Sequence, residues 1–319
     1  MPLIDVHAHF AAGPAPDPAT IAKLVTREGF SGSMPSMEWS PEIAIDFMDE
    51  RGIQMQLLSS MVDAPVPVAR AMNDIAAQIV ADHPSRFGVL ASIPMGYPDE
   101  ALAEVRHAFD DLGADGVALV TNYSGAYFGD PSFEDVFAEL DRRSASVFVH
   151  PVIPPVFSDL SLGRPGPLIE FPMETARTIV DAAYAGVFLR HPHMKVIVSH
   201  SGGVLGTLAD RITQLGPKRW IRNPHGFSGK ELRDQLASIF FDTAIAGTPA
   251  TVLPTIELAG ADHLVFGTDF PPAGVDVIDY NLAALTSGRS LSTAEFAALD
   301  DTVTRLFPKA AVRTIARRD

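Results

Sequence analysis

The sequence predicts an α/β fold in which eight βα units form a single (β/α)8 barrel. Eight short apolar runs recur along the 319 residues, and segments with helical periodicity lie between them. The runs are almost continuously apolar, which is typical of strands covered on both faces. A doubly wound sheet is disfavoured, because no glycine-rich phosphate-binding motif follows the first run. We therefore expect one barrel domain over residues 1–319.

The expected strands are short and regularly spaced along the chain. They are Leu3–Ala8, Gln54–Ser59, Phe87–Ile93, Gly116–Val120, Val147–His150, Lys195–His200, Ile239–Thr243 and His263–Thr268.

Helical signals lie between these strands. Ser40 is a candidate N-cap, Pro41 suits the first helical position, and Gly52 suits the end of the same helix. The segments 98–113 and 132–143 carry apolar residues at intervals of three and four.

Two long loops are expected, at residues 11–39 after the first strand and 151–172 after the fifth. Loops of this length on a compact domain usually carry binding function.

Composition excludes several classes of function. The formal net charge is -15, which argues against nucleic acid or an anionic membrane as a partner. The chain has no cysteine, so disulfides, thiolate metal sites and a cysteine nucleophile are excluded. The start of the chain shows no secretory signal and no apolar run of about 20 residues occurs, so a cytoplasmic enzyme is expected.

The most informative motif is "LIDVHAHF", in which His7 and His9 are two residues apart. In a strand these side chains share one face, and two buried imidazoles side by side need a common partner. His150, His200 and Asp269 also fall at the ends of expected strands, where barrel enzymes build their active sites. Three imidazoles and one carboxylate suit a divalent ion, with Zn²⁺ expected first and Mn²⁺ as the alternative.

Two further strand-end residues are candidates for the site. His200 ends the sixth run, and Asp242 ends the seventh, where it either orients a histidine or caps a helix. The remaining histidines fall in helices, turns or strand starts and are not expected to bind metal: His83, His107, His191, His193, His225 and His263.

These motifs resemble those of the amidohydrolase-related decarboxylases, the group of aminocarboxymuconate-semialdehyde, γ-resorcylate and 6-methylsalicylate decarboxylases. The resemblance rests on "DVHAHF", "FVHP", "VIVSHSGG" and "FGTDFP", with support from "HPSRF" and "RLFP". It implies that His7, His9, His150 and Asp269 are the metal ligands, and that His200 acts as an acid or base beside the metal without being a firm ligand. The fourth run, "GVALVTN", lacks the lysine that bridges two metals in many hydrolytic relatives, which favours a single metal.

The resemblance implies non-oxidative decarboxylation of an aromatic or muconate-type carboxylic acid, without an organic cofactor. His200 or Asp269 would supply or relay the proton. Arg51 and Arg211 are candidates to bind the substrate carboxylate. An arginine at the position of Arg211 can reach the neighbouring subunit's site in relatives, so a homodimer or higher homo-oligomer is expected. Aromatic residues that could line the pocket are Trp39, Tyr123, Phe157 and Phe270.

Two other interpretations remain open at this point. A mononuclear lactonase or amidase would use the same ligands to activate a hydroxide. A barrel that binds metal for stability alone is disfavoured, because structural metals are normally fully ligated and closed.

Overall fold

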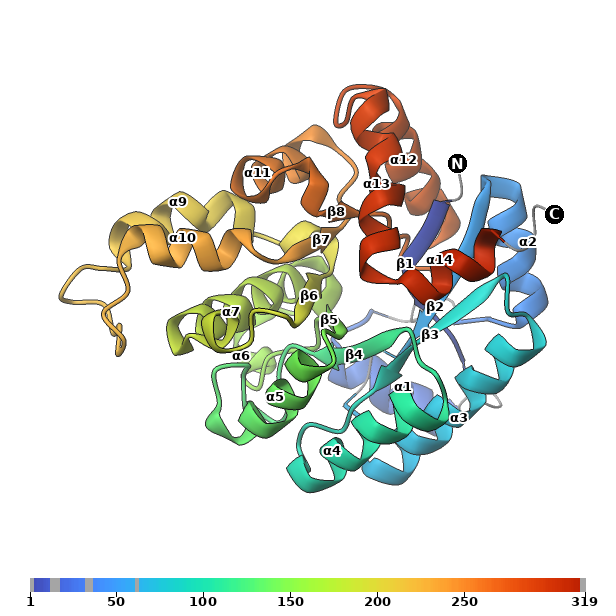
Figure 1. Cartoon of the computed structure of the whole chain (residues 1–319), viewed down its shortest axis with the longest axis horizontal. Coiled ribbons are helices and arrows are strands. Elements are labelled where there is room, and N and C mark those ends of the chain that lie inside the picture. The colour runs from blue at the N-terminus through green and yellow to red at the C-terminus, as the bar shows by residue number, and fades with distance from the viewer. Residues whose placement is uncertain (1–2, 12–17, 32–36, 61–62, 316–319) are drawn as a thin grey trace.

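The computed structural model describes residues 3–11, 18–31, 37–60 and 63–315. In this part of the chain, eight parallel strands form one sheet in the order β1 to β8 (Figure 1). Their bounds are β1 Leu3–His9, β2 Ile53–Ser59, β3 Phe87–Ser92, β4 Gly116–Val120, β5 Ser146–His150, β6 Lys195–Val198, β7 Phe240–Asp242 and β8 Leu264–Val265. The predicted (β/α)8 architecture is confirmed.

The sheet closes on itself where the residues after β8 run beside β1. Val6 donates its backbone N–H to the carbonyl of Phe266 at 2.9 Å, and His9 donates to Phe270 at 2.8 Å. These bonds join the last strand to the first and complete the barrel.

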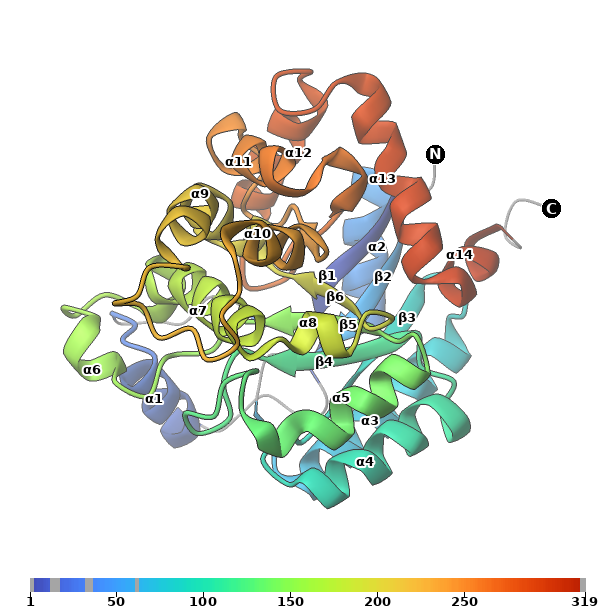
Figure 2. The same cartoon turned by 60° about the vertical axis from the view of Figure 1, so that its left-hand side comes forward.

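Helices surround the barrel, as the two views show (Figures 1 and 2). Their bounds are α1 Pro18–Arg27, α2 Pro41–Arg51, α3 Val66–Asp82, α4 Pro98–Arg106, α5 Glu134–Arg142, α6 Phe157–Leu160, α7 Glu170–Ala185, α8 Val187–Arg190, α9 Leu205–Leu215, α10 Gly229–Ala237, α11 Pro249–Ala259, α12 Val275–Thr286, α13 Thr293–Leu306 and α14 Pro308–Ile315. None of the helices described is long and apolar enough to cross a membrane.

The predicted cap and end residues of α2 are confirmed. The side chain of Ser40 accepts the backbone N–H of Ile43 at 3.2 Å, and Pro41 is the first helical residue. Gly52 ends the helix in the left-handed region, with φ of 67°. β2 begins at Ile53, directly after this glycine and opposite Leu3 of β1.

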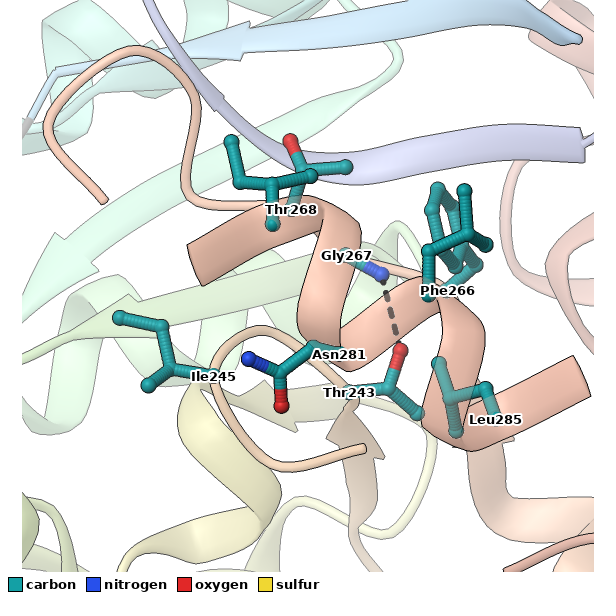
Figure 3. A pocket seen from close by; sticks show the side chains of 9 residues that line it. Thr243, Ile245, Phe266, Gly267, Thr268, Asn281 and Leu285 are labelled. Carbon is teal, nitrogen blue, oxygen red and sulfur yellow. Dashed lines mark hydrogen bonds between the residues drawn. The ribbon is translucent and has the colours of Figure 1, made fainter. Parts of the chain in front are cut away.

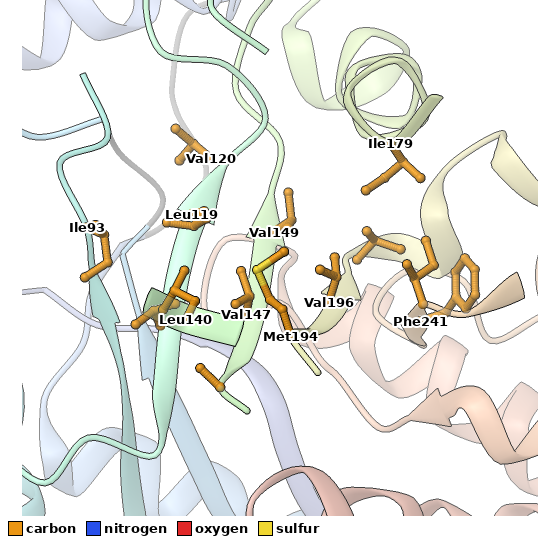
Figure 4. Packing of buried hydrophobic residues seen from close by; sticks show 14 of the residues in the cluster. Ile93, Leu119, Val120, Leu140, Val147, Val149, Ile179, Met194, Val196 and Phe241 are labelled. Atoms are coloured by element: carbon orange, nitrogen blue, oxygen red, sulfur yellow. The ribbon is translucent and has the colours of Figure 1, made fainter. Parts of the chain in front are cut away.

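The core has two apolar layers on opposite faces of the strands. In the outer layer, Val147 and Val149 of β5 pack beside Val196 of β6 and beneath Ile179 of α7 (Figure 4). Alternate residues such as Leu90 and Phe148 form a second cluster inside the barrel, together with residues at the junction of α13 and α14. This inner layer is the floor on which the site described below is built.

Several predicted bounds needed correction. β6 ends at Val198, so His200 stands in a turn, and β8 spans only Leu264–Val265. The loop after β5 contains α6 and ends where α7 begins at Glu170, earlier than predicted. The loop after β1 contains α1, and its segments 12–17 and 32–36 lie outside the described residues.

Candidate metal centre

The structure brings together the four residues that were predicted to bind a metal. His7 and His9 from β1, His150 from β5 and Asp269 after β8 each offer one ligand atom, and these atoms all lie within 4.8 Å of one another. The Nε2 atoms of His7 and His9 are 3.1 Å apart, and Oδ1 of Asp269 lies 3.3 and 3.1 Å from them. All four side chains are buried at the carboxyl ends of their strands.

Hydrogen bonds on the far side of two rings aim their Nε2 atoms at this cluster. Nδ1–H of His7 donates to Oδ2 of Asp242 at 2.6 Å, and Nδ1–H of His9 donates to the carbonyl of Ser59 at 3.3 Å. A proton held on Nδ1 leaves the lone pair on Nε2, which is the arrangement typical of metal-binding histidines. Of the two roles weighed for Asp242, the geometry favours orientation of a histidine.

The cluster also contains polar atoms that nothing in the described structure satisfies. Nδ1 of His150 is buried and has no hydrogen-bond partner among the described residues, and Oδ1 of Asp269, also without one, is buried against the Nε2 atoms of His7 and His9. Buried polar atoms almost always have a hydrogen-bond or metal partner, so these two atoms indicate that the cluster binds a further group. A set of imidazole and carboxylate donors fits Zn²⁺ or Mn²⁺.

The electrostatics point the same way. Burial alone would lower the pKa of His7, but the carboxylates of Asp242 and Asp269 raise it to about 10. Burial lowers the pKa of His9, and it lowers that of His150 well below the usual range. Burial opposes ionisation of Asp269, yet the charge on His7 holds the pKa of that carboxyl well below its ordinary value. Without a metal, the two carboxylates thus favour a proton on His7, and a divalent cation at the centre of the cluster would take the place of that proton.

His200 lies beside the cluster rather than within it. Its ring centre is 5.0 Å from that of His7, and its Nδ1–H donates to the carbonyl of Ala244 at 3.0 Å. Its backbone N–H donates to Oδ1 of Asp242 at 2.7 Å. His200 and the next three residues all have positive φ values, so this turn is held in the left-handed region. With Nδ1 occupied, Nε2 is the ring nitrogen left for a substrate or a water.

His7, His200 and Asp242 form a second group with metal-binding potential, but of their donor atoms only Nε2 of His200 is left once the hydrogen bonds and the first cluster are accounted for. Nδ1 of His7 bonds to Asp242, and Nδ1 of His200 bonds to Ala244. This geometry favours one metal over two.

A glycine closes the back of the site. A Cβ atom on Gly267 would lie 2.9 Å from Cβ of His7 and 3.2 Å from Cβ of Asp242, so this position has no room for a side chain. The N–H of Gly267 donates to Oγ1 of Thr243 at 3.3 Å (Figure 3). The cavity behind it, which Asn281 also lines, has a volume of about 10 Å³ and holds at most one water.

The structure does not bring the predicted arginines to the cluster. Arg51 ends α2 just before β2 begins, so it lies at the opposite end of the barrel, and its Nε donates to Asp279 at 2.7 Å. It also stacks over the ring of Phe47. Arg211 is exposed on α9. The structure therefore does not bring Arg51 to the four proposed ligands.

Each of the four predicted pocket aromatics contacts residues outside the metal cluster. Trp39 packs against Phe10 and Phe87, with ring centres 6.0 and 6.1 Å away. Tyr123 is buried, and its hydroxyl accepts the N–H of Val120 at 3.1 Å. Phe270 and Phe157 are buried too; Phe270 stacks on Phe47 at 4.0 Å, and Phe157 lies against Gly29.

Two other aromatic rings contact the cluster instead. The ring centre of Phe148 lies 4.9 Å from that of His7, and Phe171 lies 6.1 Å from His150. Phe148 could have been found from the sequence, because it alternates with His150 on the same strand. Phe171 could not, because its position depends on how α7 packs over the barrel.

The sequence is similar to known proteins of one family. Residues 4–299 match the model of the amidohydrolase family. A decarboxylase of Aspergillus niger is 31% identical, with 97% of this chain and 88% of the relative covered. The 6-methylsalicylic acid decarboxylase of Penicillium expansum is 33% identical, with 87% of each chain covered.

Solved structures show the same fold. A crystal structure described as amidohydrolase II is 29% identical, with a TM-score of 0.83 over 96% of this chain and 99% of the other. A dihydroxybenzoic acid decarboxylase from Polaromonas sp. JS666, solved with bound manganese and an inhibitor, has a TM-score of 0.80 at 22% identity over 96% and 97% of the two chains. The chain belongs to the amidohydrolase family, within its group of metal-dependent decarboxylases.

Proposed function

We propose that this protein removes CO₂ from a hydroxybenzoate without oxidation, using one divalent metal held by His7, His9, His150 and Asp269. The buried cluster of three imidazoles and one carboxylate carries this proposal, because its ligand atoms converge within 4.8 Å. The similarity to the 6-methylsalicylic acid decarboxylase supports a substrate of that class.

A bound metal would act as a Lewis acid that holds the carboxylate or an ortho oxygen of the substrate. We favour Zn²⁺ for this ligand set, and manganese in the Polaromonas enzyme supports Mn²⁺ as the alternative.

His200 is the proposed proton donor. Its Nδ1–H is fixed on the carbonyl of Ala244, so a proton carried on Nε2 can pass to the ring carbon that bears the carboxylate. The bond between that carbon and the carboxylate then breaks, its electron pair returns to the ring, and CO₂ leaves. Asp242 fixes both the backbone of His200 and the ring of His7, which keeps the donor at a constant distance from the metal ligands.

The substrate also needs a cation for its negative charge. Because Arg51 lies at the other end of the barrel, we propose that Arg211 of a second copy serves this role in a homodimer. Its exposure on α9 is compatible with a contact between copies. Phe148 and Phe171 would supply apolar contacts beside the metal.

The test combines metal analysis with an activity screen on the purified protein. Metal content is measured, and CO₂ release is followed with 6-methylsalicylate, 2,6-dihydroxybenzoate and carboxymuconate-type acids. We expect about one metal per chain and CO₂ release from a hydroxybenzoate. Lactone opening without CO₂ release would instead assign the protein to the hydrolases.

A further inference from the structure

A buried carboxylate that binds no metal joins the two chain segments carrying three of the proposed ligands. Oδ1 of Asp5 accepts the backbone N–H of His7 at 3.1 Å and that of Thr268 at 3.0 Å. Its Oδ2 accepts the hydroxyl of Thr268 at 2.6 Å and the side-chain amide of Gln56 at 3.0 Å. Asp5 is fully buried, so these bonds form away from competing water.

The backbone at Asp269 needs such support. Asp269 has a φ of 63°, a left-handed conformation that is unfavourable for a residue with a side chain. Conformations of this kind persist only where their surroundings fix them. The left-handed turn points the carboxylate at His7 and His9, so the strained residue is also a proposed ligand.

Three successive amides are fixed around this residue. Thr268 donates to Asp5, Asp269 donates to the carbonyl of His7 at 2.8 Å, and Phe270 donates to Oγ1 of Thr268 at 3.1 Å. Two of the three bonds thus involve Asp5 or the hydroxyl that Asp5 binds.

Regular sheet pairing does not provide this support. β8 ends at Val265, and after it only Phe266, Asp269 and Phe270 exchange backbone bonds with β1 in the described structure. Thr268 lies between Phe266 and Asp269 in the chain, and its N–H and hydroxyl both donate to the carboxylate of Asp5. The carboxylate therefore takes the place of missing strand hydrogen bonds at the barrel seam.

We infer that Asp5, acting through Thr268, is a positioning residue that sets the spacing between Asp269 and the histidines of β1. The inference rests on the proposed metal site and is independent of which reaction the site performs. Asp5 itself touches neither the metal nor the substrate.

The experiment titrates metal-free protein with Zn²⁺ against a chromophoric chelator, well below the melting temperature of every variant. Thr268→Val removes the hydroxyl and keeps the shape of the side chain, whereas Thr268→Ser keeps the hydroxyl. Asp5→Asn keeps the size of the side chain, but its N–H₂ group would face the N–H and O–H groups that donate to Asp5 in the wild type.

Asp115→Asn is the matched control. Asp115 is another buried carboxylate that joins chain segments, since it accepts the N–H of Val89 at 3.0 Å and pairs with Arg313 at 2.8 Å. Its loss should lower the melting temperature without moving any proposed ligand.

We expect Thr268→Val and Asp5→Asn to weaken Zn²⁺ binding about tenfold or more, as loss of residues that orient ligands does. Thr268→Ser and Asp115→Asn should bind close to the wild-type value. Wild-type affinity in both Thr268→Val and Asp5→Asn would overturn the inference, as would an equal loss in Asp115→Asn. If the wild type binds no metal, the proposed site fails and the inference fails with it.

Discussion

Oδ2 of Asp242 lies 2.6 Å from Nδ1 of His7, and both side chains are fully buried. The other oxygen of the same carboxylate accepts the backbone N–H groups of His200 and Ala244 at 2.7 and 3.0 Å. One residue of β7 thereby orients a proposed metal ligand and fixes the turn that carries the proposed proton donor. This carboxylate therefore helps to set the distance between His7, a proposed metal ligand, and His200, the proposed proton donor.

Asp242→Asn should separate these two tasks. An amide has one acceptor oxygen, so either His7 or the backbone of His200 must face an N–H₂ group instead. We expect metal affinity to fall about 10- to 100-fold. Isothermal titration of the metal-free variant measures this, and circular dichroism checks that the fold is kept. Affinity and kcat both equal to those of the wild type would show that this carboxylate controls neither His7 nor the turn that carries His200.

His200→Asn tests the assignment of the proton donor. The amide of asparagine can replace Nδ1–H in the bond to Ala244, but nothing replaces Nε2. We expect kcat to fall about 10²- to 10⁴-fold, the usual contribution of a general acid, while metal content stays at the wild-type level. Loss of metal in this variant would make His200 a ligand instead.

The barrel and the metal cluster could be predicted because both follow from local patterns. Apolar runs mark the strands, and ionisable residues at strand ends mark the carboxyl face of the barrel. His7, His9, His150 and Asp269 each occupy such a position.

Contacts between residues far apart in the sequence could not be predicted from local patterns. Phe270 follows β8 like a pocket residue, yet its ring stacks on Phe47 of α2. The role of Asp5 depends on Thr268 at the other end of the chain. Arg51 could have been placed correctly, because a residue just before β2 must lie at the amino end of the strands.

Removal of the metal should lower thermal stability reversibly. A ligand that binds only the folded protein stabilises it by about 2.7 kcal/mol at 100 times its Kd. For a chain of this size that corresponds to a melting temperature lower by about 4 °C after chelation. Differential scanning calorimetry before and after EDTA treatment, followed by Zn²⁺ or Mn²⁺ addition, measures the change. An unchanged melting temperature would argue against a metal bound by four buried side chains.

Gly267→Ala should damage the site although it replaces none of the proposed ligands. The added Cβ would lie 2.9 Å from Cβ of His7 and 3.2 Å from Cβ of Asp242, so the pair must separate or the strand must shift. Overpacking of this kind costs about 1–3 kcal/mol, and we expect both metal affinity and melting temperature to fall. Gly96→Ala is the control, because a Cβ on Gly96 meets no atom within 4 Å. Equal behaviour of the two variants would mean that the spacing between His7 and Asp242 is not set by close packing, and the hydrogen bond between them would then have to hold it alone.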